Sequence, residues 1–316
     1  MGLFILKRLA TLVATLVGAS IVVFLVLEIL PGNAAQIMMG PDAAPEAVQT
    51  LEAKLGIHLP PSERYLAWAT GMLTGNLGDS IAYSTPVAEL ILERLALTLP
   101  LALMAMFFTS LIALSAGVYA ATHHNKLGDV GLMGLTQVGI AIPNFWFAIL
   151  LILLFSVHLQ WFAAGGFEGW NEGFWNGVQA LFLPALSLSV VLSAILTRIT
   201  RSAVLEVLRE DFVRTARAKG LSHRAVVWKH VLRNALIPVV TVMGLQFAEL
   251  LAGTIVVENV FYLPGLGRLI FQAIANRDLI VVRNCVMLLA AMVVVVNFVV
   301  DVLYAVIDPR VKAADI

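Results

Sequence analysis

The residues best placed to do chemistry are a few ionisable side chains inside long apolar stretches. Glu249 lies in one such stretch with Gln246 one turn before it, and Asp301 lies in another. Ionisable groups within a membrane-spanning segment are costly and often mark the path of a substrate or ion. Glu249 therefore has two open interpretations, a substrate-facing carboxylate or a protonated hydrogen-bonding group between helices. For Asp301 we favour a structural role, because it lies close to the end of its stretch.

A second group of polar residues forms a basic loop between two apolar stretches. Asp211 could cap the start of a short helix, and Gly220 could supply the left-handed residue that ends it. Ser222 could then cap a following helix over residues 223–236. A basic loop needed only for membrane topology is the alternative, but topology does not require two capped helices. We therefore expect a partner to dock on these residues: Asp211, Phe212, Arg214, Thr215, Ala216, Arg217, Lys219, Gly220 and Leu221.

Motifs for the commoner catalytic sites are absent from the sequence. It contains no G-x-x-x-x-G-K-[ST] nucleotide loop, no H-E-x-x-H zinc motif and no G-x-S-x-G hydrolase turn. The single cysteine, Cys285, stands in an apolar run and cannot form an internal disulfide. We expect no catalytic residues, no metal site and no cofactor in this chain.

The composition indicates which structural elements hold these residues in place. Hydrophobic residues make up 60% of the chain and charged residues 13%, with a mean hydropathy of +0.93. Soluble domains are about 45–50% apolar and about 25% charged. We predict an all-α polytopic protein with six transmembrane helices, each of about 20 apolar residues. The zero formal net charge disfavours nucleic-acid binding. The predicted spans are 9–30, 96–121, 131–158, 180–197, 235–257 and 285–307.

Lysine and arginine positions predict the orientation of these spans. With the N-terminus inside, 14 basic residues lie on the inner side and 6 on the outer side. Because inner loops carry the excess of Lys and Arg, both termini are expected in the cytoplasm. The predicted organisation is an N-terminal transmembrane helix (1–30), an extracytoplasmic segment with short helices (31–95), a five-helix core (96–307) with a cytoplasmic loop at 201–235, and a cytoplasmic tail (308–316). The extracytoplasmic segment could receive a partner or cap its own helices.

Several stretches together resemble one known family. The chain resembles the permease subunits of peptide-type ATP-binding-cassette (ABC) importers, the dipeptide, oligopeptide and nickel group, over nearly its whole length. The stretches that carry the resemblance are Leu6-Lys-Arg-Leu, Leu30-Pro-Gly-Asn, Ala141-Ile-Pro-Asn-Phe-Trp-Phe, Arg214 to Ser222, Glu258 to Arg268, Arg277-Asp278, Val300-Asp-Val-Leu-Tyr and Asp308-Pro-Arg310.

The resemblance implies a type I ABC importer permease fold in a bacterial inner membrane. It implies a second homologous permease subunit, two ABC ATPase subunits that bind ATP and Mg²⁺, and a periplasmic or extracellular substrate-binding protein. Gly220 stands at the glycine of the family's ATPase-coupling loop, and Arg214 stands where many importers have a glutamate. The helix before Gly220 would lie in a cleft of an ATPase. Candidate residues of the translocation path are Asn144, Gln246 and Glu249.

Alternatives to a peptide importer remain open from the residues alone. The same class of transporter imports nickel, metal chelates, glutathione or opines. A gradient-driven secondary transporter or channel, or an intramembrane enzyme, could use Glu249 and Asp301 instead. The loop around Gly220 discriminates between them, since only an ATP-driven importer needs a docking module there.

Overall fold

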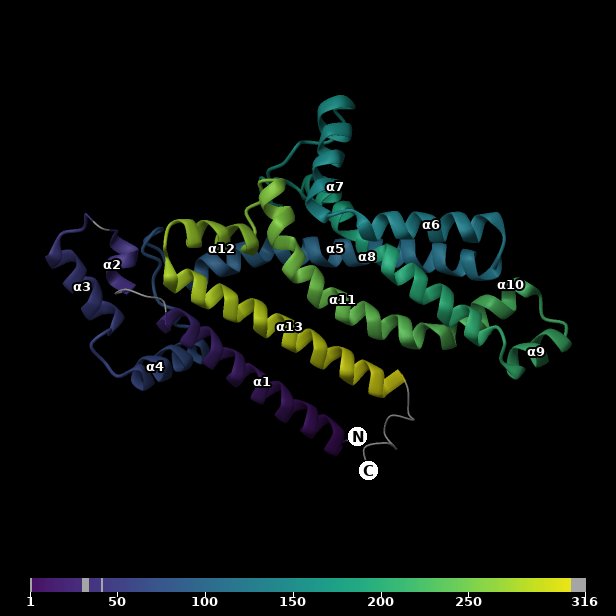
Figure 1. Ribbon diagram of the computed structural model, residues 1–316, viewed down its shortest axis with the longest axis horizontal. Coiled ribbons are helices and arrows are strands. Elements are labelled where there is room, and N and C mark those ends of the chain that lie inside the picture. The colour runs from purple at the N-terminus through teal and green to yellow at the C-terminus, as the bar shows by residue number, and fades with distance from the viewer. Residues whose placement is uncertain (1, 30–33, 41, 308–316) are drawn as a thin grey trace. The chain divides into compact units, whose positions relative to one another are not determined.

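The computed structural model describes residues 2–29, 34–40 and 42–307; most of these residues are helical, and none belongs to a named strand (Figure 1). This confirms the predicted all-α polytopic class. The Leu30-Pro-Gly-Asn stretch and the predicted tail at 308–316, with Asp308-Pro-Arg310, lie outside the described residues. Among the described residues, five helices are long and apolar enough to cross a membrane. They are α1 (Gly2–Ile29), α5 (Val87–Thr122), α8 (Phe174–Val207), α11 (Leu232–Val260) and α13 (Leu279–Ile307).

The sixth predicted span is a bent pair of helices rather than one rod. α6 (Leu127–Ala141) and the run formed by α7 (Asn144–Leu151) and the π-helix η1 (Ile152–His158) meet at an angle of 102°. The cause is Pro143, which disfavours helical backbone in the residue before it. Ile142 is accordingly extended, with φ −85° and ψ 123°. A single span over residues 131–158 was predicted from the sequence, so the break at Pro143 is a correction to that span.

The chain forms two compact units. The first comprises Met1–Arg8, Leu99–Leu263 and Val296–Ile316, and the second comprises Leu9–Thr98 and Pro264–Val295. In the first unit α8 is the central element, because it packs against α6, α7 and α11. Close approach depends on small residues: a Cβ added at Gly117 of α5 would lie 2.6 Å from the Thr200 side chain of α8. Small residues have the same use at helix contacts in membranes generally.

The second unit holds the short helices α2 (Ala34–Met39), α3 (Pro45–Leu55), α4 (Pro61–Thr74) and α12 (Leu266–Ala275). Proline stands at the start of α3 and α4, where its missing N–H has no helical partner in any case. Trp68 of α4 is buried, and its Nε1 donates a hydrogen bond to Asn284 Oδ1 at 2.9 Å. Arg64 of α4 forms an ion pair with Glu28. Residues of α4 in the predicted segment 31–95 therefore contact α13 and α1 of the same unit.

Candidate functional site

The predicted docking helix forms as α9 (Asp211–Ala218), with one correction at its start. Glu210, not Asp211, occupies the N-cap position, and its side chain makes no capping hydrogen bond. Asp211 lies in the first turn, where its carboxylate faces the positive end of the helix dipole. It also pairs with Arg214 at 3.4 Å. Asp211 thus favours the helix through charge rather than through the predicted cap.

The end of α9 follows the prediction. Gly220 has φ +82°, in the left-handed region that favours glycine. Its N–H donates to the Arg217 carbonyl at 2.9 Å, and the Leu221 N–H donates to the Ala216 carbonyl at 3.4 Å. These bonds are those of a Schellman-type ending. Ser222 caps the next helix as predicted, since its Oγ accepts a hydrogen bond from the Ala225 N–H at 3.3 Å.

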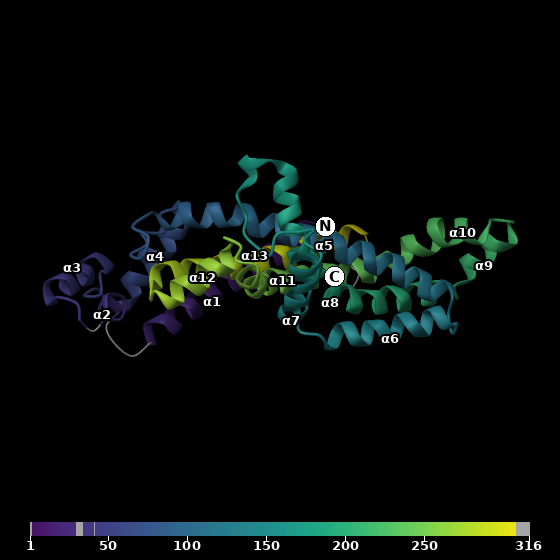
Figure 2. The same cartoon turned by 90° about the horizontal axis from the view of Figure 1, so that it is seen from above.

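The helix after Ser222 is not a separate element. α10 (His223–Val226), the π-helix η3 (Val227–Val231) and α11 form one continuous helical run over His223–Val260. α10 and α11 are therefore joined by unbroken helical backbone. Figures 1 and 2 show α9 and α10 together at the end of the first unit where α8 finishes and α11 begins.

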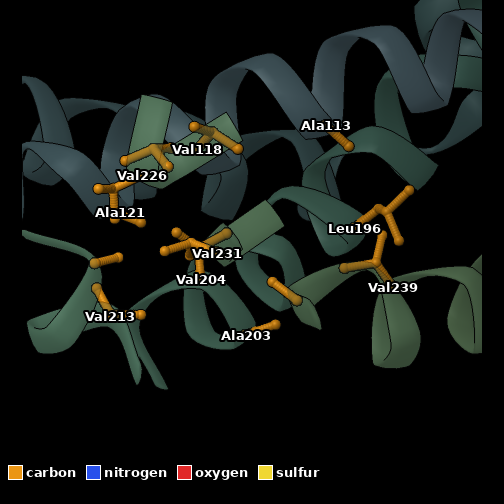
Figure 3. Packing of buried hydrophobic residues seen from close by; sticks show 13 residues of the cluster. Ala113, Val118, Ala121, Leu196, Ala203, Val204, Val213, Val226, Val231 and Val239 are labelled. Carbon is orange, nitrogen blue, oxygen red and sulfur yellow. The ribbon is translucent and has the colours of Figure 1, made fainter. Parts of the chain in front are cut away.

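The two faces of α9 have different surroundings. Val213 and Ala216 are buried in a core cluster that also contains Val204 of α8, Val226 and Val231 (Figure 3). The remaining predicted docking residues are exposed: Asp211, Phe212, Arg214, Thr215, Arg217, Lys219, Gly220 and Leu221. Ala216 thus anchors the helix, while its neighbours offer a basic surface with two exposed apolar side chains, Phe212 (42% exposed) and Leu221 (41%).

The same unit contains a partly buried ion pair between Asp129 and Arg201 that was not predicted from the sequence. The Asp129 carboxylate accepts hydrogen bonds from Arg201 Nε at 2.6 Å and from its NH2 at 2.7 Å. It also accepts one from the Asn125 N–H at 2.9 Å, and its side chain is 2% exposed. A bidentate pair of this kind is geometrically specific. It links the start of α6 to α8, ten residues before α9 begins.

The three candidate path residues do not share one surface. Gln246 of α11 is buried, and its Nε2 donates to the Leu192 carbonyl of α8 at 3.1 Å, while its Oε1 has no partner among the described residues. Asn144 begins α7, and its Oδ1 is likewise buried without a partner in the part of the chain that the structure describes. Glu249 is exposed on α11 in a stripe with Leu245 and Val256. Of the three, Glu249 is exposed, Asn144 is partly exposed and Gln246 is buried.

Asp301 and Cys285, the other ionisable residues considered from the sequence, both contact neighbouring side chains of their own unit. Asp301 forms an ion pair with Arg8 at 3.1 Å, which agrees with the structural role favoured for it. Cys285 is buried in an apolar cluster with Val281 and Ile270. Within residues 2–29, 34–40 and 42–307, no group of three or more His, Cys, Asp or Glu side chains could hold a metal ion.

Comparisons with known proteins bear on both units. Residues 113–313 match the family described as binding-protein-dependent transport system inner membrane component, and residues 1–102 match the family of its N-terminal part. A putative peptide transport system permease protein of Brucella abortus is 40% identical over 312 residues, which cover 99% of both chains. An oligopeptide transport system permease protein of Bacillus subtilis is 39% identical, over 99% of this chain and 100% of that protein. A solved structure of the inward-facing MetNI methionine ABC transporter matches this chain with a TM-score of 0.54 at 19% identity. The match covers 69% of this chain and 96% of that chain, so the two chains share a fold.

Proposed function

This chain belongs to the family of binding-protein-dependent transport system inner membrane components, and from that membership we propose that it is the permease subunit of an ATP-driven importer of di- or oligopeptides. It is a multi-pass inner membrane protein that works with ATPase and substrate-binding partners. Membership of this family disfavours the gradient-driven transporter and the intramembrane enzyme. The proposed cargo follows the curated relatives, which carry names of peptide, dipeptide and oligopeptide permeases.

The exposed basic face of α9 is the feature that best supports this proposal. It presents Arg214, Arg217 and Lys219 on an exposed face while Val213 and Ala216 hold it in the core of the unit. The sequence has no nucleotide-binding loop of its own. We therefore assign ATP and Mg²⁺ to two partner ATPases, each docked on the exposed face of an α9 helix, with a second homologous permease completing the membrane part. The excess of Lys and Arg supports an orientation with α9 and both termini in the cytoplasm.

Reconstitution tests this function. The chain, expressed with its neighbouring genes and carrying a tag, should retain an ATPase subunit through purification. In proteoliposomes the complex should take up a labelled tripeptide only when ATP is inside and the binding protein is outside. Uptake that follows a proton gradient without ATP, or a chain that never retains an ATPase, would contradict the proposal.

Glu249 is the residue that we assign to the translocation path. It lies 17 residues after the start of α11 and 11 before its end, or about 26 Å and about 16 Å at 1.5 Å per residue. An exposed carboxylate at this depth would be costly against lipid. It is therefore placed to face the second permease or a water-filled path, where it can attract the ammonium group of a peptide.

The Glu249→Gln variant should reduce ATP-dependent uptake of a tripeptide with a free amino terminus by about tenfold, which corresponds to losing one charged interaction of about 1.4 kcal/mol. Retention of the ATPase subunit should not change, because α9 lies at the far end of α11. Glu172→Gln removes an exposed carboxylate from an outer loop of the same unit and serves as the matched control. Equal uptake by the Glu249→Gln variant and the wild type would remove Glu249 from the path.

A further inference from the structure

A cavity of about 480 Å³ lies within the first unit, between α6, the last turns of α8 and the beginning of α11. Small-molecule sites usually have volumes of about 300–1,000 Å³. Most of its wall is apolar, and α8 contributes its polar side chains. The apolar wall includes Ile140, Ile195, Ile199 and Pro238, and the polar side chains from α8 are Arg198, Ser202 and Glu206.

The polar side chains form a regular stripe. Arg198, Ser202 and Glu206 are four residues apart, so they lie on one face of α8, and all three are exposed. The backbones of Arg198 and Glu206 are about two turns apart, about 12 Å along the helix axis, and no ion pair joins the two side chains. Neither has an ion-pair partner among the residues that the structure describes. Arg201, by contrast, lies off this stripe and binds Asp129.

Opposite charges at this spacing suit a small zwitterion with an apolar middle. An extended peptide spans about 3.3–3.6 Å per residue, so three residues cover about 10 Å between their charged ends. The isoleucine and proline side chains of the wall would contact the side chains of such a peptide without selecting among apolar types. A lipid chain would match the apolar wall but leave both charges unpaired.

We propose that this cavity is a binding site for the transported peptide in its zwitterionic form, with Arg198 binding the α-carboxylate and Glu206 the α-ammonium group. Ser202 lies between them, where its hydroxyl can hydrogen-bond the peptide backbone. The inference rests on the proposed function and adds to it the location of a site and its preference for short peptides with two free ends.

The cavity lies closer than Glu249 to the end of the unit that carries α9, so we place it in the cytoplasmic part of the translocation path. Pro238 and Glu249 both lie on the exposed side of α11, 11 residues or about 16 Å apart. Glu206 is five residues before α9, so the cavity lies at the end of the unit that carries the docking helix. A peptide that passes Glu249 from outside would reach this cavity before its release.

The experiment measures peptide binding to the purified importer complex in nanodiscs, without binding protein or nucleotide. The probes are trialanine, N-acetyl-trialanine and trialanine amide. Arg198→Glu and Glu206→Arg should each weaken trialanine binding about fivefold, and the double variant, which exchanges the charges, should recover most of the affinity. Blocking the amino end should make binding insensitive to Glu206→Arg, and blocking the carboxyl end should make it insensitive to Arg198→Glu.

Arg209→Glu is the matched control, because Arg209 is an exposed arginine beyond the end of α8 and does not line the cavity. Each variant must elute as an intact complex, and the recovery in the double variant shows that loss in the single variants is not misfolding. If the single variants bind trialanine as the wild type does, or if end-blocking does not change their effects, the site is refuted while ATP-dependent uptake leaves the proposed function intact. If the wild type neither binds nor imports any peptide, the proposed function fails and the site fails with it.

Discussion

Replacing Gly220 by proline should uncouple this protein from its ATPase and abolish import. Proline fixes φ near −65°, whereas Gly220 has φ +82°, and proline also removes the N–H that bonds the Arg217 carbonyl. A conformational penalty of about 3 kcal/mol corresponds to about a hundredfold loss of the docked conformation. ATP-dependent peptide uptake should fall to background, and retention of the ATPase subunit should fall with it.

The backbone conformation, not crowding, is the cause of this effect. No atom lies within 4 Å of a Cβ added at Gly220. Gly220→Asn should therefore retain uptake, because asparagine tolerates the left-handed region, whereas Gly220→Val should lose it. Gly166→Pro is the matched control, because Gly166 also has a positive φ and no atom within 4 Å of an added Cβ. Its N–H donates to the Phe261 carbonyl, and it lies outside α9 and α10. Normal uptake by the Gly220→Pro variant would show that α9 does not transmit the work of an ATPase.

Replacing Asp278 by alanine should strongly destabilise the second unit. Asp278 immediately precedes α13, and its Oδ1 accepts a hydrogen bond from the Val281 N–H at 3.2 Å, as an N-cap residue does. Its Oδ2 accepts hydrogen bonds from Ser80 Oγ at 2.6 Å, from the Ile81 N–H at 3.0 Å and from the Ala82 N–H at 3.1 Å. The side chain therefore ties the segment before α5 to the beginning of α13.

Alanine at this position would leave several buried donors without an acceptor. Asp278 is 1% exposed, so water cannot readily replace the carboxylate. Charged hydrogen bonds contribute about 1.5–3 kcal/mol each and are not additive, so we expect a loss of about 3–5 kcal/mol. At about 2–4 °C per kcal/mol this lowers the Tm by about 10 °C. Thermal stability of the purified protein, followed by size-exclusion chromatography after heating, measures the change.

Asp79→Ala is the matched control for Asp278→Ala, because Asp79 is an exposed aspartate of the same unit. It should leave the Tm within about 1 °C, as expected for a surface substitution. An Asp278→Ala variant as stable as the Asp79→Ala variant would show that the four hydrogen bonds contribute little. Asp278→Asn should fall between the two, because it retains one acceptor oxygen.

Features that depend on nearby residues were predictable from the sequence. The ending of α9 at Gly220 and the cap at Ser222 are local, because both rest on hydrogen bonds to residues within five positions. The predicted cap at Asp211 was wrong by one residue. Glu210 and Asp211 are both acidic, and sequence alone could not decide which of them leaves helical geometry.

Hydropathy, charge and helix capping are properties of short stretches, so the sequence was enough to predict an all-α membrane protein with a basic helix that ends at Gly220. Which side chains contact one another became known from the tertiary structure. Asp129 and Arg201 are 72 residues apart, and no spacing rule links them. Gln246 and Glu249, one turn apart in the same stretch, have opposite surroundings, because α8 covers the first and leaves the second exposed. The reason is that burial depends on the neighbouring helix, and the choice of neighbour depends on packing along the whole chain.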